Sequence, residues 1–107
     1  MILEILLEIE EGEHSHVAIR NALSKYQFLP KQDRAFITRV CEGTLEYRIQ
    51  IDYIINSFSK VTVDKMKPAI REILRSAVYQ LKYMDSVPDS AVCNEAVKLA
   101  QRKGFII

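Results

Sequence analysis

Glycine and proline, which build tight turns, are scarce in this sequence: three of each occur among its 107 residues. A β-sandwich or a β-barrel needs many such turns, so the scarcity argues against both architectures. Cysteine is scarcer still, with only Cys41 and Cys93 and no CxxC or metal-ligand spacing. This usage argues against a disulfide scaffold and favours a reducing compartment, so we expect a cytoplasmic protein.

Signals for catalysis, metal binding and membranes are also lacking. The sequence contains no Gly-rich phosphate loop, no GxSxG and no HExxH motif, so we predict no catalytic residue. His14 and His16 flank Ser15 without any further ligand spacing, and we predict no metal site and no cofactor in this chain. Glu4 and Glu8 interrupt the first apolar run, so we expect neither a signal peptide nor a membrane span.

The net charge of +1 does not by itself indicate a polyanionic partner. The distribution of charge along the chain is more informative. Residues 1–15 carry five glutamates and no lysine or arginine, whereas 16–60 and 61–107 each have a balance of +3. An acidic start therefore offsets a moderately basic remainder, and this asymmetry is compatible with nucleic-acid binding.

Apolar residues recur with helical spacing along almost the whole chain, which predicts an all-α fold in a single domain, 1–107. Pro30 and Pro68 mark the starts of helices. The long segment after Pro30 carries two apolar stripes in different registers, so we expect a break between Tyr47 and Gln50. The prediction is a bundle of five or more helices.

The segment that follows Pro68 has the clearest helical stripe, formed by Ile70, Ile73, Leu74, Ala77, Leu81 and Met84. Leu74 lies in the middle of this stripe, so we expect it near the centre of the core. Its replacement by alanine should then lower the free energy of unfolding by roughly 2–5 kcal/mol. In the preceding helical segment, the expected core residues are Ile51, Ile54, Ile55 and Phe58.

The chain closes on three large apolar residues after Gly104, namely Phe105, Ile106 and Ile107. One interpretation is a short tail that folds back on the core. The other, which we favour, is that the bundle is cut before its last helix, because terminal residues are usually polar. An apolar region left uncovered in this way could support self-association.

One surface feature indicates nucleic-acid binding. At about 100° per residue, Arg71, Arg75 and Lys82 fall in a narrow stripe off the apolar face of their helix, with Tyr79 and Tyr83 beside them. Cations between aromatic rings can pair with phosphates and stack on unpaired bases. The following helix adds a neighbouring pair of cations. The predicted RNA-binding residues are Arg71, Arg75, Tyr79, Lys82, Lys98 and Arg102.

Two alternatives to this interpretation stay open. Charged side chains on a helix face can simply be solvated, and Arg75 can pair inside the fold with a carboxylate such as Glu95. Arg39 is left out of the RNA-binding set because Glu42 and Glu46 share its helix face and are expected to pair with it.

Three stretches of the sequence form a specific combination of motifs. Residues 33–55 contain DRAF, EGTL, Arg48 and IDYII; residues 73–81 contain ILR and YQL; residues 87–97 read VPDSAVCNEAV. In this order the motifs resemble those of the NusB-like family and cover most of 30–100. The resemblance implies an all-α, NusB-like bundle that binds RNA.

Within that family, free transcription antitermination factors typically open with a basic helix, whereas the opening here is acidic. The GTL and PDS motifs are similar to those at the start of Sun/Fmu-type ribosomal RNA (cytosine-5) methyltransferases. Such enzymes make 5-methylcytosine in small-subunit ribosomal RNA, with S-adenosylmethionine bound by a later catalytic domain. The resemblance thus implies an RNA-binding, substrate-positioning module whose partners are ribosomal RNA and that catalytic domain. It also implies that the family sequence continues beyond Ile107.

Two other functions remain open at this point. The chain can be a standalone antitermination factor of the NusB type. It can also be a protein-docking adaptor that makes no direct contact with RNA.

Overall fold

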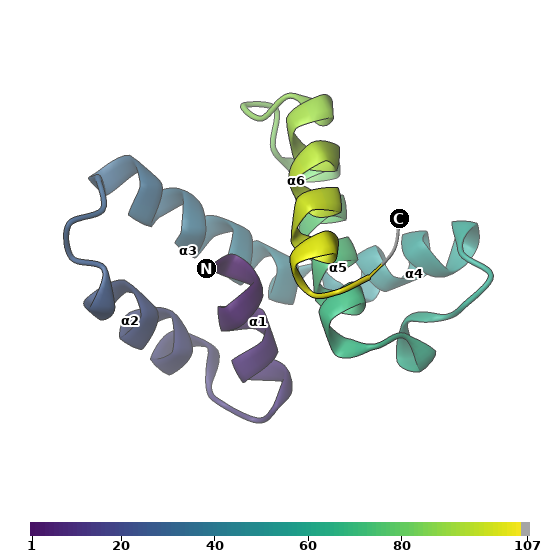
Figure 1. The fold of residues 1–107 in the computed structure, drawn as a ribbon, viewed down its shortest axis with the longest axis horizontal. Helices are drawn as coiled ribbons and strands as arrows, with labels where there is room; N and C mark the ends of the chain where they lie inside the picture. Colours follow the sequence, from purple (N-terminus) through teal and green to yellow (C-terminus); the bar gives the residue numbers. More distant parts are fainter. Residues whose placement is uncertain (106–107) are drawn as a thin grey trace.

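The computed structural model describes residues 1–105, and over this range the chain is helical with no strand (Figure 1). Within it, the helices are α1 (Ile2–Glu10), α2 (Ser15–Lys25), α3 (Lys31–Glu46), α4 (Arg48–Phe58), α5 (Pro68–Tyr83) and α6 (Asp89–Arg102), with a short 3-10 turn, η1 (Val63–Lys65). The predicted all-α bundle is therefore confirmed. No helix in the described part is long and apolar enough to cross a membrane.

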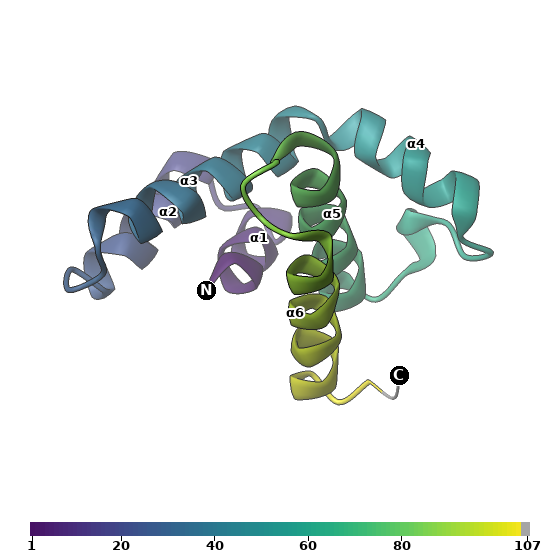
Figure 2. The same cartoon turned by 90° about the horizontal axis from the view of Figure 1, so that it is seen from above.

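Helix α5 lies at the centre of the bundle and contacts α1, α3, α4 and α6. Helices α1, α2 and α3 pack on one another to one side of α5, while α4 and η1 lie on the other side (Figure 1). Helix α6 returns antiparallel to α5 after a short turn, so that the two lie side by side in both views (Figure 2). The central position of α5 decides which of its side chains reach solvent.

Three clusters of buried apolar side chains make up the core. The cluster among α1, α2 and α3 consists of Ile5, Leu6, Ala18, Ile19, Ile37 and Cys41. The cluster that joins α3, α4, η1 and α5 consists of Val40, Ile51, Ile55, Val63, Tyr79 and Met84. The third joins α1, α5 and α6 through Leu3, Ile73 and Ala100.

Gly43 lets α3 and α5 approach closely. The ring of Tyr79 lies so near the backbone of Gly43 that a Cβ atom there would overlap the ring carbon Cζ. Two non-bonded carbon atoms do not come this close, so either the added Cβ or the tyrosine ring would have to move. The glycine of the GTL motif therefore accommodates a buried tyrosine of the central helix.

The predicted break in the long helical segment is confirmed: α3 ends at Glu46 and α4 begins at Arg48, so that Tyr47 separates two helix axes. The prediction that Phe58 belongs to the core was wrong, since this side chain is 89% exposed. It lies in the last turn of α4, beyond the segment that α5 covers, and apolar spacing alone does not reveal where the covering helix stops.

The predicted place of Leu74 at the centre of the core was also wrong. Leu74 is half-buried at the margin of its cluster, and Leu81 is 41% exposed. The fully buried residues of α5 are Glu72, Ile73, Ser76 and Tyr79. Because α5 has neighbours on several sides, its buried surface includes polar residues that an apolar stripe cannot indicate.

At the C-terminal end, the described part of the predicted apolar segment is Phe105. Its side chain is half-buried and packs against the third core cluster, and Lys67 Nζ lies 5.5 Å from the centre of its ring. The other two residues of that prediction, Ile106 and Ile107, lie outside the described residues.

Candidate nucleic-acid interface

Arg71, in the first turns of α5, is engaged inside the fold. Its Nη1 group donates hydrogen bonds to the carbonyl oxygens of Val63 and Met66, each 3.0 Å long. Its Nη2 group pairs with the Glu10 carboxylate at the end of α1. The side chain is only 14% exposed. Arg71 therefore ties the start of α5 to η1 and to α1.

Arg75, one turn later, is held by two carboxylates. It makes a two-point contact with Asp52 of α4, through Nε to Oδ1 and Nη2 to Oδ2, both 2.8 Å. Its Nη1 donates to Glu72 Oε2 at 2.7 Å. The expected internal carboxylate partner is thus present, but it is Asp52 together with Glu72 rather than Glu95. Planar two-point pairing of this kind is specific to arginine.

Burial raises the pKa of the Glu72 carboxyl above its ordinary value, an effect that the charge of Arg75 and its hydrogen bond only partly offset. The Glu72 side chain is 5% exposed, which explains why desolvation dominates. Next to this pair, Thr44 Oγ1 is buried without a hydrogen-bond partner. The first half of α5 is thus the polar part of the protein interior.

Tyr79 lies in the core and is 5% exposed. It is the buried member of a stack of three tyrosine rings that are all neighbours of one another. The ring centroids are 5.4 Å apart for Tyr79 and Tyr83, 4.4 Å for Tyr83 and Tyr47, and 6.4 Å for Tyr79 and Tyr47. Tyr47 and Tyr83 are half-buried, and the Tyr83 hydroxyl donates a hydrogen bond to Gln50 Oε1. The stack therefore leads from the core to the surface.

Two cations lie at the outer end of this stack. Lys82 is exposed, and its Nζ atom is 5.7 Å from the centre of the Tyr83 ring. Arg39, which is also exposed, donates from Nη2 to the Tyr83 carbonyl oxygen at 3.3 Å. Among the described residues, no ion pair joins Arg39 to Glu42 or Glu46, so the reason for leaving Arg39 out of the set was wrong. We define the tyrosine edge as Arg39, Tyr47, Gln50, Lys82 and Tyr83.

A shallow groove of about 580 Å³ runs along α3 next to the tyrosine edge. It shares Arg39 with the edge and has Tyr79 in its lining; the other lining residues are Lys31, Arg34, Ala35, Thr38, Glu42, Gly43 and Glu46. Arg34 is anchored there by hydrogen bonds to the carbonyl oxygens of Leu23 and Tyr26. The arginine of the DRAF motif thus fixes the end of α2 to α3.

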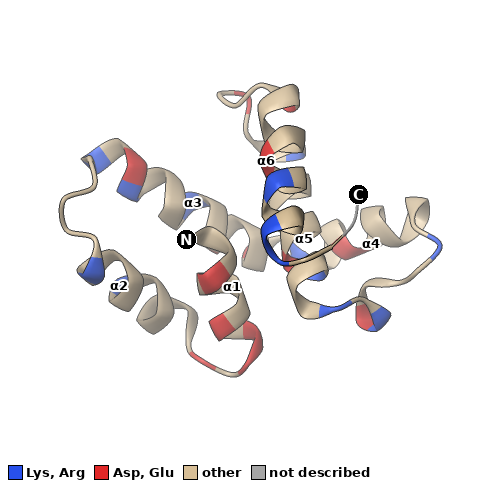
Figure 3. Cartoon of the chain, viewed as in Figure 1, with Lys and Arg blue, Asp and Glu red and all other residues tan. Residues whose placement is uncertain are grey.

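Lys98 and Arg102 lie on the last turns of α6, and both are exposed. Because α5 and α6 are antiparallel, Lys82 and Arg102 are at opposite ends of the pair, about 20 Å apart along the axis at a rise of 1.5 Å per residue. The acidic α1 lies near this end of α6, where Leu3 packs with Ala100 in the third core cluster (Figure 3). The pKa of Glu4 is held low first by the hydrogen bond from the amino terminus, and in smaller measure by the charge of Lys103.

The structure thus divides the six predicted RNA-binding residues. Lys82, Lys98 and Arg102 reach solvent, whereas Arg71 and Arg75 are engaged in internal pairs and Tyr79 is buried. Within residues 1–105, no group of three or more His, Cys, Asp or Glu could hold a metal ion. Burial raises the pKa of the Cys41 thiol to about 12, which favours the neutral thiol over the thiolate.

The profile of the NusB family matches residues 1–105. A protein of Bacillus subtilis named probable ribosomal RNA small subunit methyltransferase B is 31% identical over 102 residues, covering 95% of this chain and 23% of that protein. A protein of the same name from Synechocystis is 35% identical over 102 residues, covering 94% of this chain and 23% of its own length.

Transcription antitermination protein NusB of Desulforamulus reducens is 30% identical over 101 residues, covering 92% of this chain and 70% of that protein. The chain therefore spans about a quarter of the methyltransferases that it matches, and a larger share of this antitermination protein.

Proposed function

Because this chain belongs to the NusB family, we propose that it is an RNA-binding module that positions ribosomal RNA for a methyltransferase. The matched methyltransferases are about four times the length of the matching region. In this proposal, catalysis lies in the remainder of such a protein, which would bind S-adenosylmethionine. The catalytic domain is then a partner of the bundle, and the bundle itself performs no chemistry.

The tyrosine edge is the observation on which the RNA-binding proposal rests. It places two exposed cations, Arg39 and Lys82, beside the surface end of a tyrosine stack. Phosphates can pair with the cations while an unpaired base stacks on the exposed ring surface. Asp52, Glu72 and Glu10 are paired with the arginines of α5. Glu42 and Glu46 line the groove that contains Arg39, and among the described residues neither forms an ion pair with it.

Lys98 and Arg102 extend the proposed interface along α6. An RNA strand that begins at Lys82 and follows α6 would reach them after about 20 Å. Five of the fourteen acidic residues lie within residues 1–15, on α1 and the loop that follows it (Figure 3). Lys82, at the other end of the α5–α6 pair from Arg102, is therefore the cation of this interface that lies farther from the acidic helix, and approach of a polyanion is favoured from its side.

The RNA-binding proposal is tested by titration of labelled single-stranded and hairpin RNA at low salt, with the charge-reversal variants Lys82→Glu and Arg39→Glu. Each variant should weaken binding several-fold and leave the melting temperature nearly unchanged, because neither side chain belongs to the core. The matched control is Lys25→Glu, an exposed lysine that lines a groove with Glu8 and Glu13. If all three variants bind equally well, the tyrosine edge is not the interface.

A second candidate function is that of a free antitermination factor, which the similarity to antitermination protein NusB of Desulforamulus reducens favours. The two functions predict preferences for different RNA molecules. A module of a methyltransferase should prefer fragments of small-subunit ribosomal RNA over unrelated RNA of equal length. Equal affinity for both, together with tight binding of a short linear leader sequence, would favour the antitermination role. If the chain bound no RNA under any condition, the remaining alternative would be that it is a protein-docking adaptor.

A further inference from the structure

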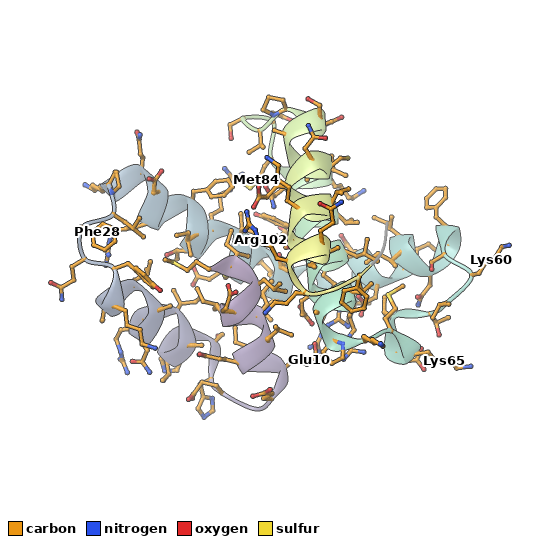
Figure 4. All side chains as sticks on the ribbon, viewed as in Figure 1. Glu10, Phe28, Lys60, Lys65, Met84 and Arg102 are labelled. Carbon is orange, nitrogen blue, oxygen red and sulfur yellow. The ribbon has the colours of Figure 1, made fainter. Side chains whose placement is uncertain are left out.

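The tip between α4 and η1 carries an aromatic side chain that the fold does not use. Phe58 is 89% exposed, the highest value among the large apolar residues in the described part of the chain. Val61, three residues later, is 49% exposed, and Lys60 between them is exposed as well. In Figure 4, Lys60 marks the outer end of this tip.

The tip is held in place by hydrogen bonds at several points. Asn56 Oδ1 accepts the backbone N–H of Val63 at 2.9 Å. Ser59 Oγ donates to the carbonyl oxygen of Val61 at 2.7 Å and accepts its N–H at 3.2 Å. Arg71 fixes the far side of the segment through the carbonyl oxygens of Val63 and Met66. The exposed ring of Phe58 therefore stands on an ordered support, which reduces the entropy lost when a ligand binds.

The segment that follows Phe58 in the sequence is basic. Residues 58–67 contain three lysines, Lys60, Lys65 and Lys67, against a single acid, Asp64. The carboxylate of Asp64 accepts a hydrogen bond from Thr62 Oγ1, whereas no ion pair with a carboxylate occupies Lys60 or Lys65 among the described residues. An exposed aromatic ring among cations suits a polyanion with flat bases better than an apolar protein surface.

A second exposed phenylalanine provides an internal comparison. Phe28, between α2 and α3, is 80% exposed, and it lies at the opposite end of the molecule from Lys60 (Figure 4). Its ring packs edge-on against Tyr26. Tyr26 lines a groove that contains Glu4 and Glu8 of the acidic helix together with Lys25. The two phenylalanines are thus similarly exposed, and they differ in position: Phe58 ends α4, the helix that begins beside the tyrosine edge, whereas Phe28 lies at the opposite end of the molecule from Lys60.

Helix α4 connects the tyrosine edge to the tip. It has 11 residues, which at 1.5 Å per residue span about 16 Å, or roughly five stacked nucleotides at about 3.4 Å each. Tyr53 lies between the two sites and is 75% exposed. At 100° per residue Tyr53 is about 60° from Gln50, which belongs to the tyrosine edge, and Phe58 is about 80° from Gln50 on the other side. A single strand that follows α4 from the edge to Phe58 therefore runs on the side of Gln50 away from Tyr53.

We propose that the tip is a second RNA contact, at which an unpaired base stacks on Phe58 and the neighbouring phosphates pair with Lys60 and Lys65. This inference rests on the proposed RNA-binding function and specifies its ligand as a single strand long enough to follow α4. Strands of about three nucleotides should bind the tyrosine edge alone, and strands of about eight or more should reach both sites.

The sequence contains no tryptophan, so a single one introduced at either tip reports locally. The experiment compares Phe58→Trp with Phe28→Trp in titrations with oligoadenylate of about three and about twelve nucleotides. Stacking of adenine on the indole should quench the fluorescence of Phe58→Trp with the long strand only, and Phe28→Trp should show no quenching. In parallel, Phe58→Ala should weaken binding of the long strand about tenfold, with Phe28→Ala as the matched control.

The possible failures are distinguishable. If the unmodified chain binds no RNA at low salt, the proposed function itself is wrong. If it binds the long strand but Phe58→Trp is not quenched and Phe58→Ala binds as well as Phe28→Ala, only the tip proposal is overturned. A Phe58→Ala variant that changes sedimentation but not RNA affinity would overturn it as well, and would assign the tip to a protein contact.

Discussion

The two ends of α5 carry similar side chains but use them differently. At the N-terminal end, Arg71 and Arg75 donate to backbone carbonyls and carboxylates of α1, α4 and η1, and both side chains are less than 15% exposed. At the C-terminal end, Lys82 is exposed and lies against the half-buried ring of Tyr83. A helix projection places all these cations in one stripe, but the tertiary fold separates them into structural and surface groups.

The difference follows from the neighbours of each end. The first turns of α5 are surrounded by α1, η1 and α4, so a cation there must find a partner or carry the cost of burial. The last turn lies where α3 ends and α4 begins, and there the side chains reach solvent. Position along a central helix, rather than residue type, therefore decides which cations are available to RNA.

The largest effect should come from removing Arg75. The variant Arg75→Ala leaves Glu72 and Asp52 without their shared cation, with Glu72 only 5% exposed. Breaking a buried pair by removing one partner costs about 3–5 kcal/mol, so we expect a loss of that order or failure to fold. Chemical denaturation measures the loss. Lys82→Ala is the control at the other end and should change the unfolding free energy by less than about 0.5 kcal/mol.

A somewhat smaller loss should follow from Gly43→Ala, which tests the contact between α3 and the middle of α5. The added methyl group would overlap the Tyr79 ring, and overpacking of this kind typically costs about 1–3 kcal/mol. The effect should depend on the ring. In the background Tyr79→Leu, the same glycine substitution should be clearly less destabilising, so that a double-mutant cycle shows coupling. Equal losses in both backgrounds would argue against a tight contact.

The pH dependence of stability should show the buried state of Glu72. Because burial raises its pKa in the folded protein, the folded state binds the proton more tightly than the unfolded state. Its contribution to stability is therefore largest at low pH and decreases as the pH rises through the raised pKa. Glu72→Gln removes this contribution while keeping an oxygen that can accept from Arg75.

The measurement is the difference in unfolding free energy between the unmodified chain and Glu72→Gln, at about pH 5 and about pH 8. We expect the unmodified chain to lose stability relative to the variant as the pH rises. Taking the difference cancels the titration of the other carboxyl groups. A change of opposite sign would mean that the charge of Arg75, and not burial, dominates at Glu72.

Much of the fold could be predicted from the sequence, because its signals are local. Pro30 immediately precedes α3 and Pro68 is the first residue of α5, as expected, and the change of register at Tyr47 correctly indicated two helices. The errors concern places where one helix stops covering another. Phe58 and Leu81 continue an apolar stripe beyond the covered region, so their spacing is helical although their side chains are exposed.

The candidate site was harder to predict because its contacts are not local. The carboxylate partner of Arg75 lies 23 residues away, and the carbonyl that Arg39 contacts lies 44 residues away. No helix projection contains such pairs. Arg39 was left out because acidic residues share its helix face, yet the nearer interaction is with the end of α5. The tyrosine stack had a partial signal, since Tyr79 and Tyr83 are four residues apart, but Tyr47 joins it only in three dimensions.

The salt dependence of RNA affinity tests the division of α5 most directly. On single strands, each phosphate contact contributes about 0.7 to the slope of log affinity against log salt. We compare the unmodified chain with Lys82→Gln and Arg71→Gln, each well below its melting temperature. Lys82→Gln should lower the slope by about 0.7 and keep the melting temperature, whereas Arg71→Gln should keep the slope and melt lower. A lower slope for Arg71→Gln at an unchanged melting temperature would contradict the division of the α5 cations into structural and surface groups.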